Sequence, residues 1–319
     1  MGLNITELTG DKVQAIINAL LALEPGLVTT TQAGKLAPDA EAIADGFIKL
    51  ATSSNKGLMS KAFAALLESP EAIQFIGGKS LTQKAGFHNC LYRGKNLGTS
   101  VSAAQYSAIS AGTFDDMFIG DYWVINSVTW RIAAFDYWYN TGDTNCTTHH
   151  IVIVPDTNLA TGKMNDTHIT TGAYVGCDFY TAANGNTHKA TCKTAIEGAF
   201  GSAHLLNHRE LLSNATADGK ASAWSWYDST FDLMSESMVY GAPISGAQKT
   251  GDTNFNIGID KTQLPLFQHD ASRICNRADW WLRDVVSATY FAYVSGYGYA
   301  NYASASDGFG IRPAFGIRA

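Results

Sequence analysis

The sequence predicts an α+β fold in two parts, a small all-α module over residues 1–82 and a larger mixed domain over residues 83–319. Apolar residues in the first part recur at helical spacing, whereas strand-like runs and turn residues follow it. Residues 1–80 hold three aromatic residues, and the remaining chain holds 33. This change in composition, next to a pair of glycines, predicts a linker near residues 77–86.

The predicted helical module contains three amphipathic stripes. They span residues 13–21, 43–50 and 59–67, and the third ends before Pro70. Three short helices make a small core, of a size that often needs a partner to be stable. The module is therefore predicted either to fold as a self-contained bundle or to serve as an assembly or attachment segment.

The mixed domain is predicted to begin with a β-hairpin and a buried strand. Residues 122–125 and 128–132 are largely apolar and flank Asn126 and Ser127. Asn tolerates the positive φ that a two-residue hairpin turn requires. Residues 150–154 form a short, mostly apolar run, which is typical of a buried strand.

Two helices are predicted to interrupt these strands. One runs roughly over residues 194–213, and a shorter one lies around Phe231, Met234 and Met238. A last strand is predicted over residues 310–318. Because the helices do not alternate regularly with the strands, the pattern favours an α+β fold over a doubly wound sheet.

The composition excludes several classes of function. Only 16% of the residues are charged, the net charge is −6 and no basic stretch occurs, so we expect no nucleic-acid partner. No apolar run reaches the roughly 18 residues that a membrane span requires, so no membrane insertion is expected. The five cysteines are odd in number and form no C-x-x-C pair, which predicts reduced thiols in a protein made in a cytoplasm.

No catalytic or metal-binding motif stands out. His204 and His208 have the i, i+4 spacing of two metal ligands on a helix, but Leu-Leu-Asn lies between them and no third ligand is marked. We expect packed or surface histidines there, and structural roles for His149 and His150. No nucleophile elbow, P-loop or dinucleotide fingerprint is present. The sequence therefore predicts no catalytic residue, no metal and no cofactor.

The stretch from Asp284 to Gly310 has a restricted composition. It contains five Tyr, five Ala, four Ser and four Gly, and it lacks Lys, Arg, Trp, Met, Gln and Glu. Mutation of the first two bases of an Asn codon cannot produce five residue types. These are Trp, Gln, Met, Lys and Glu, and all five are absent from this stretch. Tyr, Ser, Gly and Asn are the residues typical of antibody contact loops. The stretch predicts a binding surface, with a tyrosine-rich sheet and a glycine-containing turn as the alternative.

The motifs around this stretch resemble a known family. The matching segments are Asp-Trp-Trp-Leu-Arg-Asp at 279–284, Phe-Ala-Tyr-Val at 291–294 and Gly-Ile-Arg-Pro-Ala-Phe at 310–315. They resemble the C-terminal end of the C-type-lectin-like variable proteins that retroelements diversify in phages and bacteria. Residues 117–156 are similar to tail-associated proteins of phages from gut bacteria. The resemblance implies a C-type-lectin-like domain over residues 83–319, with a variable region at about 279–310.

The resemblance also implies which residues are fixed and which bind ligand. The implied scaffold comprises Trp280, Trp281, Leu282, Arg283, Phe291, Val294, Gly298, Ala300, Phe309, Gly310, Arg312 and Pro313. The implied ligand-facing positions are Thr289, Tyr290, Tyr293, Ser295, Gly296, Tyr297, Tyr299, Asn301, Tyr302, Ala303, Ser304 and Asp307. Strand-like alternation is expected to place Tyr293, Ser295, Tyr297 and Tyr299 on one exposed face. We expect both tryptophans in the core, and both arginines in hydrogen bonds to the backbone.

In function, the resemblance implies a phage receptor-binding or tail protein, made in the host cytoplasm and located in the virion tail. Its hypervariable, Tyr-rich surface would recognise a host-surface protein or glycan, and its N-terminal module would bind other virion proteins. A homo-oligomer is expected, with a trimer favoured. The calcium motifs of lectins are absent from the sequence, so calcium-dependent sugar binding is not expected. The alternatives are an enzyme on the related formylglycine-generating scaffold, for which Cys275 is the only late cysteine, and a purely structural virion protein.

Overall fold

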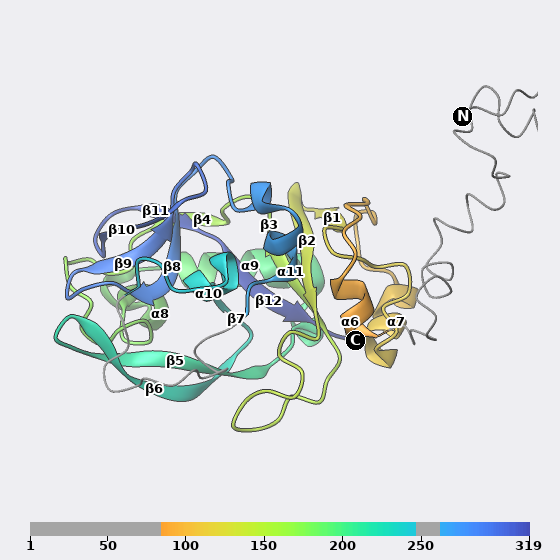
Figure 1. Cartoon of the computed structure of the whole chain (residues 1–319), viewed down its shortest axis with the longest axis horizontal. Coiled ribbons are helices and arrows are strands. Elements are labelled where there is room, and N and C mark those ends of the chain that lie inside the picture. The colour runs from red at the N-terminus through yellow and green to blue at the C-terminus, as the bar shows by residue number, and fades with distance from the viewer. Residues whose placement is uncertain (1–83, 247–261) are drawn as a thin grey trace, which may run out of the picture. The chain divides into compact units, whose positions relative to one another are not determined.

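The computed structural model describes residues 84–246 and 262–319, which belong to one compact unit that runs over Thr82–Ala319 (Figure 1). The predicted helical module over residues 1–82 lies outside the described residues. The described part is an α+β fold with mostly antiparallel sheets and short helices, as the sequence predicts at this level.

The strands form two five-stranded sheets and one two-stranded ribbon. The first sheet is antiparallel throughout and has the order β1 (Tyr122–Ile125), β2 (Val128–Phe135), β3 (Ile151–Pro155), β12 (Pro313–Ile317) and β7 (Phe231–Leu233). The second has the order β10 (Ala300–Ser304), β9 (Tyr290–Val294), β8 (Trp280–Val285), β11 (Phe309–Ile311) and β4 (Ala160–Gly162), and only its β8–β11 pair is parallel. The ribbon consists of β5 (His208–Ala217) and β6 (Lys220–Ser229), the long pair of strands at the bottom of Figure 1.

The predicted hairpin and buried strand are confirmed. Asn126 and Ser127 have φ angles of 53° and 63°, so both adopt the left-handed conformation of the tight turn that joins β1 to β2. Strand β3 begins one residue later than predicted, and all five of its residues are buried. Local turn residues and apolar runs thus predicted this corner of the first sheet.

The long helix predicted over residues 194–213 is wrong in its second half. Helix α9 (His188–Phe200) ends at Gly201, whose φ of 79° is unfavourable for most other residues. A single turn, η3 (Ser202–His204), follows, and Leu206 then donates its N–H to the Gly316 carbonyl of β12 at 2.9 Å. The chain continues into β5, so residues 208–213 of the predicted helix are strand residues.

The second predicted helix is also only partly correct. Residues 231–233 form β7, and the helix α10 (Glu236–Tyr240) starts after Ser235, whose hydroxyl accepts a hydrogen bond from the Met238 N–H. The remaining short helices are α6 (Ala85–Asn89), α7 (Ala103–Ala111), α8 (Asp178–Thr181), η2 (Ala183–Gly185), α11 (Pro265–His269) and η4 (Ala271–Arg273). Within the two described ranges, no helix is long and apolar enough to cross a membrane.

The predicted C-terminal strand is divided at Arg312 into β11 and β12, which belong to different sheets. Arg312 is almost fully buried and donates hydrogen bonds to the carbonyls of Pro155 and Arg273 at 2.8 and 2.9 Å. The expected backbone role of this arginine is therefore confirmed. Arg283 differs, because its guanidinium bonds the buried carboxylate of Glu210 at 2.7 Å.

The core contains the aromatic residues that the sequence placed there. Trp280 and Trp281 have no exposed surface, which confirms their expected core positions. The Trp281 indole N–H donates to the Gly162 carbonyl of β4 at 2.9 Å, so this buried polar group is satisfied. In the first sheet, the Trp130 ring meets those of Phe200 and Phe315 edge to face, at 5.4 and 5.7 Å.

Candidate binding surface

Strands β9 and β10 present the expected variable residues on two faces. Residues directly opposite each other in an antiparallel pair point to the same face. Ser304 lies opposite Tyr290, and Asn301 lies opposite Tyr293. Tyr290, Tyr302 and Ser304 therefore share one face of the hairpin, and the other face carries Tyr293 and Asn301.

The outer part of this hairpin is rich in exposed tyrosine. Tyr297, Tyr299 and Tyr302 are 79%, 54% and 50% exposed, and they make up half of the six large apolar side chains that are exposed in the described part of the chain. The rings of Tyr297 and Tyr299 are parallel with centroids 6.4 Å apart, and the Tyr290 and Tyr302 rings are 5.4 Å apart. We call these four residues the tyrosine surface.

A turn brings the first two of these tyrosines to the outside. Strand β9 ends at Val294, so the predicted strand-like alternation through residue 299 is wrong. Ser295 is buried: its N–H donates to the Tyr299 carbonyl, and its hydroxyl accepts from the Tyr297 N–H at 3.2 Å. The turn closes at Gly298, which has a φ of 90°. Ser295 therefore holds the turn and does not face a ligand.

Gly296 is also part of the frame of this turn. Its N–H donates to the Asp279 carboxylate at 2.7 Å, and a Cβ at this position would lie 3.1 Å from the Ala278 nitrogen. A larger residue would press against backbone, so this site tolerates variation poorly.

The other predicted positions differ in how far they reach solvent. Tyr293 is half-buried, with its ring 4.5 Å from that of Phe309, and its hydroxyl accepts a hydrogen bond from Asn301 at 3.0 Å. Thr289, Ala303 and Ser304 are half-buried as well, and Asp307 is exposed. The twelve predicted residues are thus neighbours in space, but the exposed ones are fewer than predicted.

A second segment, far away in sequence, adjoins the tyrosine surface. The His168 ring packs edge-on against Tyr290 at 5.2 Å and hydrogen-bonds the Ser304 hydroxyl. Ile169, next along the chain, is 46% exposed. Neither residue was predicted from the sequence, because the stretch of restricted composition lies more than a hundred residues away and no local motif marks them.

The loop that carries this pair is fixed by the buried residues on either side. The side-chain oxygen of Asn165 accepts the Asp178 N–H at 2.8 Å, and the amide group of the same side chain donates to the Ile169 carbonyl at 2.7 Å. Thr170 donates its N–H to the Ala288 carbonyl at 2.9 Å, at the turn between β8 and β9. His168 and Ile169 are therefore held in place beside the hairpin.

Strand β10 is an edge strand, so half of its backbone groups point away from the sheet. Ala305 donates its N–H to the Thr289 carbonyl across the hairpin at 3.0 Å. Since hydrogen-bonded pairs alternate along an antiparallel ladder, Tyr302 and Ser304 direct their N–H groups outward.

Side-chain oxygens of neighbouring residues accept hydrogen bonds from both of these outward N–H groups. Tyr302 donates its N–H to the Asn301 side-chain oxygen at 2.9 Å, and Ser304 donates to the Asp307 carboxylate at 3.1 Å. An edge capped in this way is a poor template for another strand. The hairpin therefore offers side chains, rather than main chain, to a partner.

The two histidines with metal-like spacing are not brought together as ligands. The His204 ring stacks on Tyr106 at 3.9 Å and bonds the Arg318 carbonyl, whereas His208 lies in β5 and bonds the buried Glu210 at 3.2 Å. They were predicted to share a helix, but the chain turns at residues 201–204 and extends. Across residues 84–246 and 262–319, no group of three or more His, Cys, Asp or Glu has a geometry that could hold a metal ion.

The remaining polar candidates have structural partners. His149 pairs with the Asp136 carboxylate at 2.7 Å, and the buried His150 accepts the Trp138 N–H at 3.1 Å. All five cysteines lie in the described part and none forms a disulfide. The late Cys275 donates its thiol hydrogen to the Gly296 carbonyl at 2.9 Å, below the tyrosine-bearing turn.

Comparison with known proteins identifies one family. A family model described as a domain of unknown function (DUF6273) matches residues 123–319, which include both five-stranded sheets except the first residue of β1. No curated protein and no solved structure matches the chain.

Proposed function

Since this chain belongs to the DUF6273 family, a domain of unknown function, we propose a function from its own geometry: it is a binding protein that recognises a ligand through the tyrosine surface. The observation that carries the proposal is the exposure of Tyr297, Tyr299 and Tyr302 on a hairpin whose first strand, β9, has Phe291, Ala292 and Val294 fully buried. Exposed aromatic groups on a fixed frame provide large contact area at a low entropic cost. A cluster of them on a protein surface marks an interaction site.

The surface is proposed to extend beyond the C-terminal stretch. His168 and Ile169 belong to a separate, anchored loop and lie beside Tyr290 and Ser304. They would supply a fixed apolar contact next to the residues that the sequence predicts to vary. Because the outward N–H groups of β10 are capped, the partner would be recognised by side chains and not by addition of a strand.

The finer identity that we propose is a C-type-lectin-like variable protein of a phage tail, with a host-surface protein or glycan as its receptor. An α+β fold with mostly antiparallel sheets agrees with it. Burial supports it too, because the implied scaffold residues Trp280, Trp281 and Phe291 are in the core. Three of the five implied variable tyrosines, Tyr297, Tyr299 and Tyr302, are exposed. A homo-oligomer, proposed as a trimer, would raise the avidity of a weak single site.

The test is to replace Tyr297, Tyr299 and Tyr302 together by Ser and to measure binding to host cells and the melting temperature. We expect binding to be lost and the melting temperature to change little, because these side chains are exposed. Ile244→Ser is the matched control, since Ile244 is 60% exposed and belongs to none of these segments. Full binding by the triple variant would refute the proposed function, and a large fall in melting temperature would show that the tyrosines stabilise the fold.

A further inference from the structure

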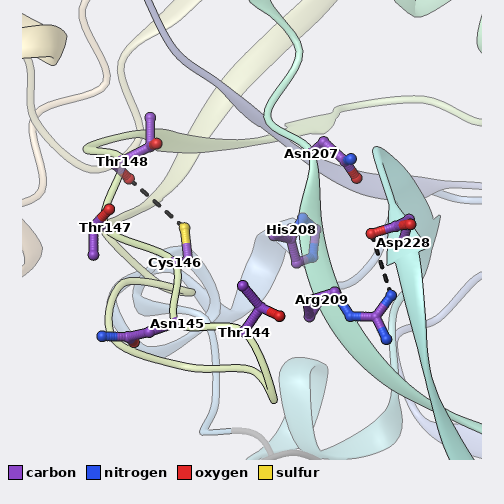
Figure 2. A pocket seen from close by; sticks show the side chains of 9 residues that line it. All are labelled: Thr144, Asn145, Cys146, Thr147, Thr148, Asn207, His208, Arg209 and Asp228. Atoms are coloured by element: carbon purple, nitrogen blue, oxygen red, sulfur yellow. Dashed lines mark hydrogen bonds and ion pairs between the residues drawn. The ribbon is translucent and has the colours of Figure 1, made fainter.

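A pocket separate from the tyrosine surface lies between the loop at 144–148 and the end of the β5–β6 ribbon where β5 begins and β6 ends (Figure 2). Its volume is about 360 Å³. The residues that line it are Thr144, Asn145, Cys146, Thr147, Thr148, Asn207, His208, Arg209 and Asp228. None of them belongs to the tyrosine surface or to the adjoining loop, so any ligand of this pocket would be bound separately.

The one arginine of the pocket is already paired with two carboxylates. Arg209 donates to both carboxylate oxygens of Asp143, at 2.7 and 3.0 Å, and lies 3.2 Å from the Asp228 carboxylate. The third partner of its guanidinium is the Trp226 carbonyl, which accepts a hydrogen bond at 3.0 Å. A free anion would have to compete with two carboxylates for this arginine, so the site does not favour anions.

Uncharged polar groups surround this ion pair. Four of the lining residues are exposed and have side chains that make no hydrogen bond to the described part of the chain. They are Thr144, Thr147, Thr148 and Asn207. In Figure 2 the three threonines and Cys146 lie on one side, and Asn207, Arg209 and Asp228 lie on the other. Hydroxyl and amide groups both donate and accept, so they suit a ligand that does the same.

Hydrogen bonds within the protein hold the loop that forms one wall of the pocket. Asn140 donates its N–H to the Cys146 carbonyl at 2.8 Å, and Cys146 donates its N–H to the Thr141 carbonyl at 3.1 Å, which closes the loop on itself. The two-pronged contact between Arg209 and Asp143 then fixes the loop against β5. A site that is already ordered loses less entropy when it binds.

We propose that this pocket binds a neutral saccharide. The lining is polar and its arginine is already paired with carboxylates. Its volume is at the small end of the roughly 300–1,000 Å³ typical of ligand sites, which suits one or two sugar rings. It lacks the aliphatic and aromatic side chains that an apolar ligand needs. A sugar hydroxyl can donate to a Thr or Asp oxygen and accept from Asn or Arg. The proposal goes beyond the proposed function, because it concerns a separate surface that shares no residue with the tyrosine surface.

The experiment is ligand-observed NMR titration of the full chain with methyl glycosides of glucose, galactose and mannose and with N-acetylated hexosamines. We expect at least one of them to bind with millimolar affinity. Asn207→Ala combined with Thr147→Val should weaken this binding about tenfold or more, since each lost hydrogen bond is worth about 1 kcal/mol. Thr161→Val, at an exposed threonine on β4, is the matched control and should bind normally.

Three results would overturn the saccharide site. They are failure of every neutral sugar to bind, undiminished binding by the Asn207→Ala and Thr147→Val variant, and binding of acetate or phosphate in place of sugars. The triple tyrosine variant separates this proposal from the previous one. If that variant loses the sugar as well, the sugar sits on the tyrosine surface and the pocket is not its site.

Discussion

At the scale of single residues, two neighbouring acids set a pH dependence. Glu236 accepts hydrogen bonds from the N–H groups of Ile244, Ser245 and Gly246, at 2.7–3.0 Å. The Asp284 carboxylate accepts the Glu236 N–H at 2.8 Å. Burial raises the pKa of Asp284 to about 7, and the negative charge of Glu236 adds to the shift.

The raised pKa predicts that Asp284 lowers stability at neutral pH. An unfolded Asp ionises near pH 3.9, so between about pH 4 and pH 7 the folded protein binds one proton more than the unfolded one. The protonated Asp284 therefore adds its full contribution to the free energy of unfolding below about pH 4, and this contribution is lost as the pH rises through 7. Asp284→Asn keeps an oxygen for the Glu236 N–H and removes the titration.

We expect Asp284→Asn to gain stability over the parent protein as the pH rises from 4 to 8, by about 4 kcal/mol, because the pKa rises from about 3.9 to about 7 on folding and each unit corresponds to about 1.4 kcal/mol. Urea unfolding at several pH values would measure this difference. Asp115→Asn, at an exposed carboxylate elsewhere on the surface, is the matched control. If the stability difference between Asp284→Asn and the parent protein does not change with pH, Asp284 does not set this dependence.

At the scale of elements, the capped edge of β10 predicts what happens when its caps are removed. Asn301→Ala with Asp307→Ala would free the outward N–H groups of Tyr302 and Ser304. Because an open edge pairs readily with another strand, we expect the double variant to self-associate more than the parent protein.

Light scattering over a concentration series would measure this association. Asp115→Ala, which removes an exposed carboxylate elsewhere, controls for the change in net charge. If the double variant and the parent protein have the same mass at every concentration, the caps do not protect the edge.

The same elements show what sequence reasoning can and cannot predict. The turn at Asn126 and Ser127 was predictable because Asn, which tolerates positive φ, stands in the turn itself and marks it in the sequence. The break at Gly201 was missed because the chain after it is extended through pairing with distant strands: Leu205 and Leu206 pair with β12, and β5 pairs with β6.

The candidate site was likewise predictable only in part. Composition located the tyrosines, but it could not show that Ser295 turns inward, although Gly296 and Gly298 beside it are typical turn residues. His168 and Ile169 reach the surface through contacts between distant segments, which no local pattern encodes.

At the scale of the whole described unit, Arg312 connects the two five-stranded sheets. It is the one residue between β11 and β12, and its hydrogen bonds reach the end of β3 at Pro155 and the short helix η4 at Arg273. Its guanidinium also lies 5.0 Å from the Trp280 ring, which makes a cation–π contact. One buried side chain thus contacts both sheets and the segment before β8.

Replacing Arg312 should therefore destabilise both sheets together. We expect Arg312→Leu to cost about 3 kcal/mol, because it leaves two buried carbonyls without their donors. Arg312→Lys should recover only a small part, since an ammonium group cannot span both carbonyls in the way that the planar guanidinium does. Tryptophan fluorescence and far-UV circular dichroism during urea unfolding would follow the sheets and should give coincident transitions.

Arg318, next to the last residue of the chain, offers the matched control for this prediction. Its guanidinium bonds the exposed carbonyl of the neighbouring Ala319, so Arg318→Leu should change stability by less than about 0.5 kcal/mol. If Arg312→Lys were as stable as the parent protein, positive charge alone would be sufficient at this position. The two sheets would then be held together by their apolar packing, and the bridging hydrogen bonds would contribute little.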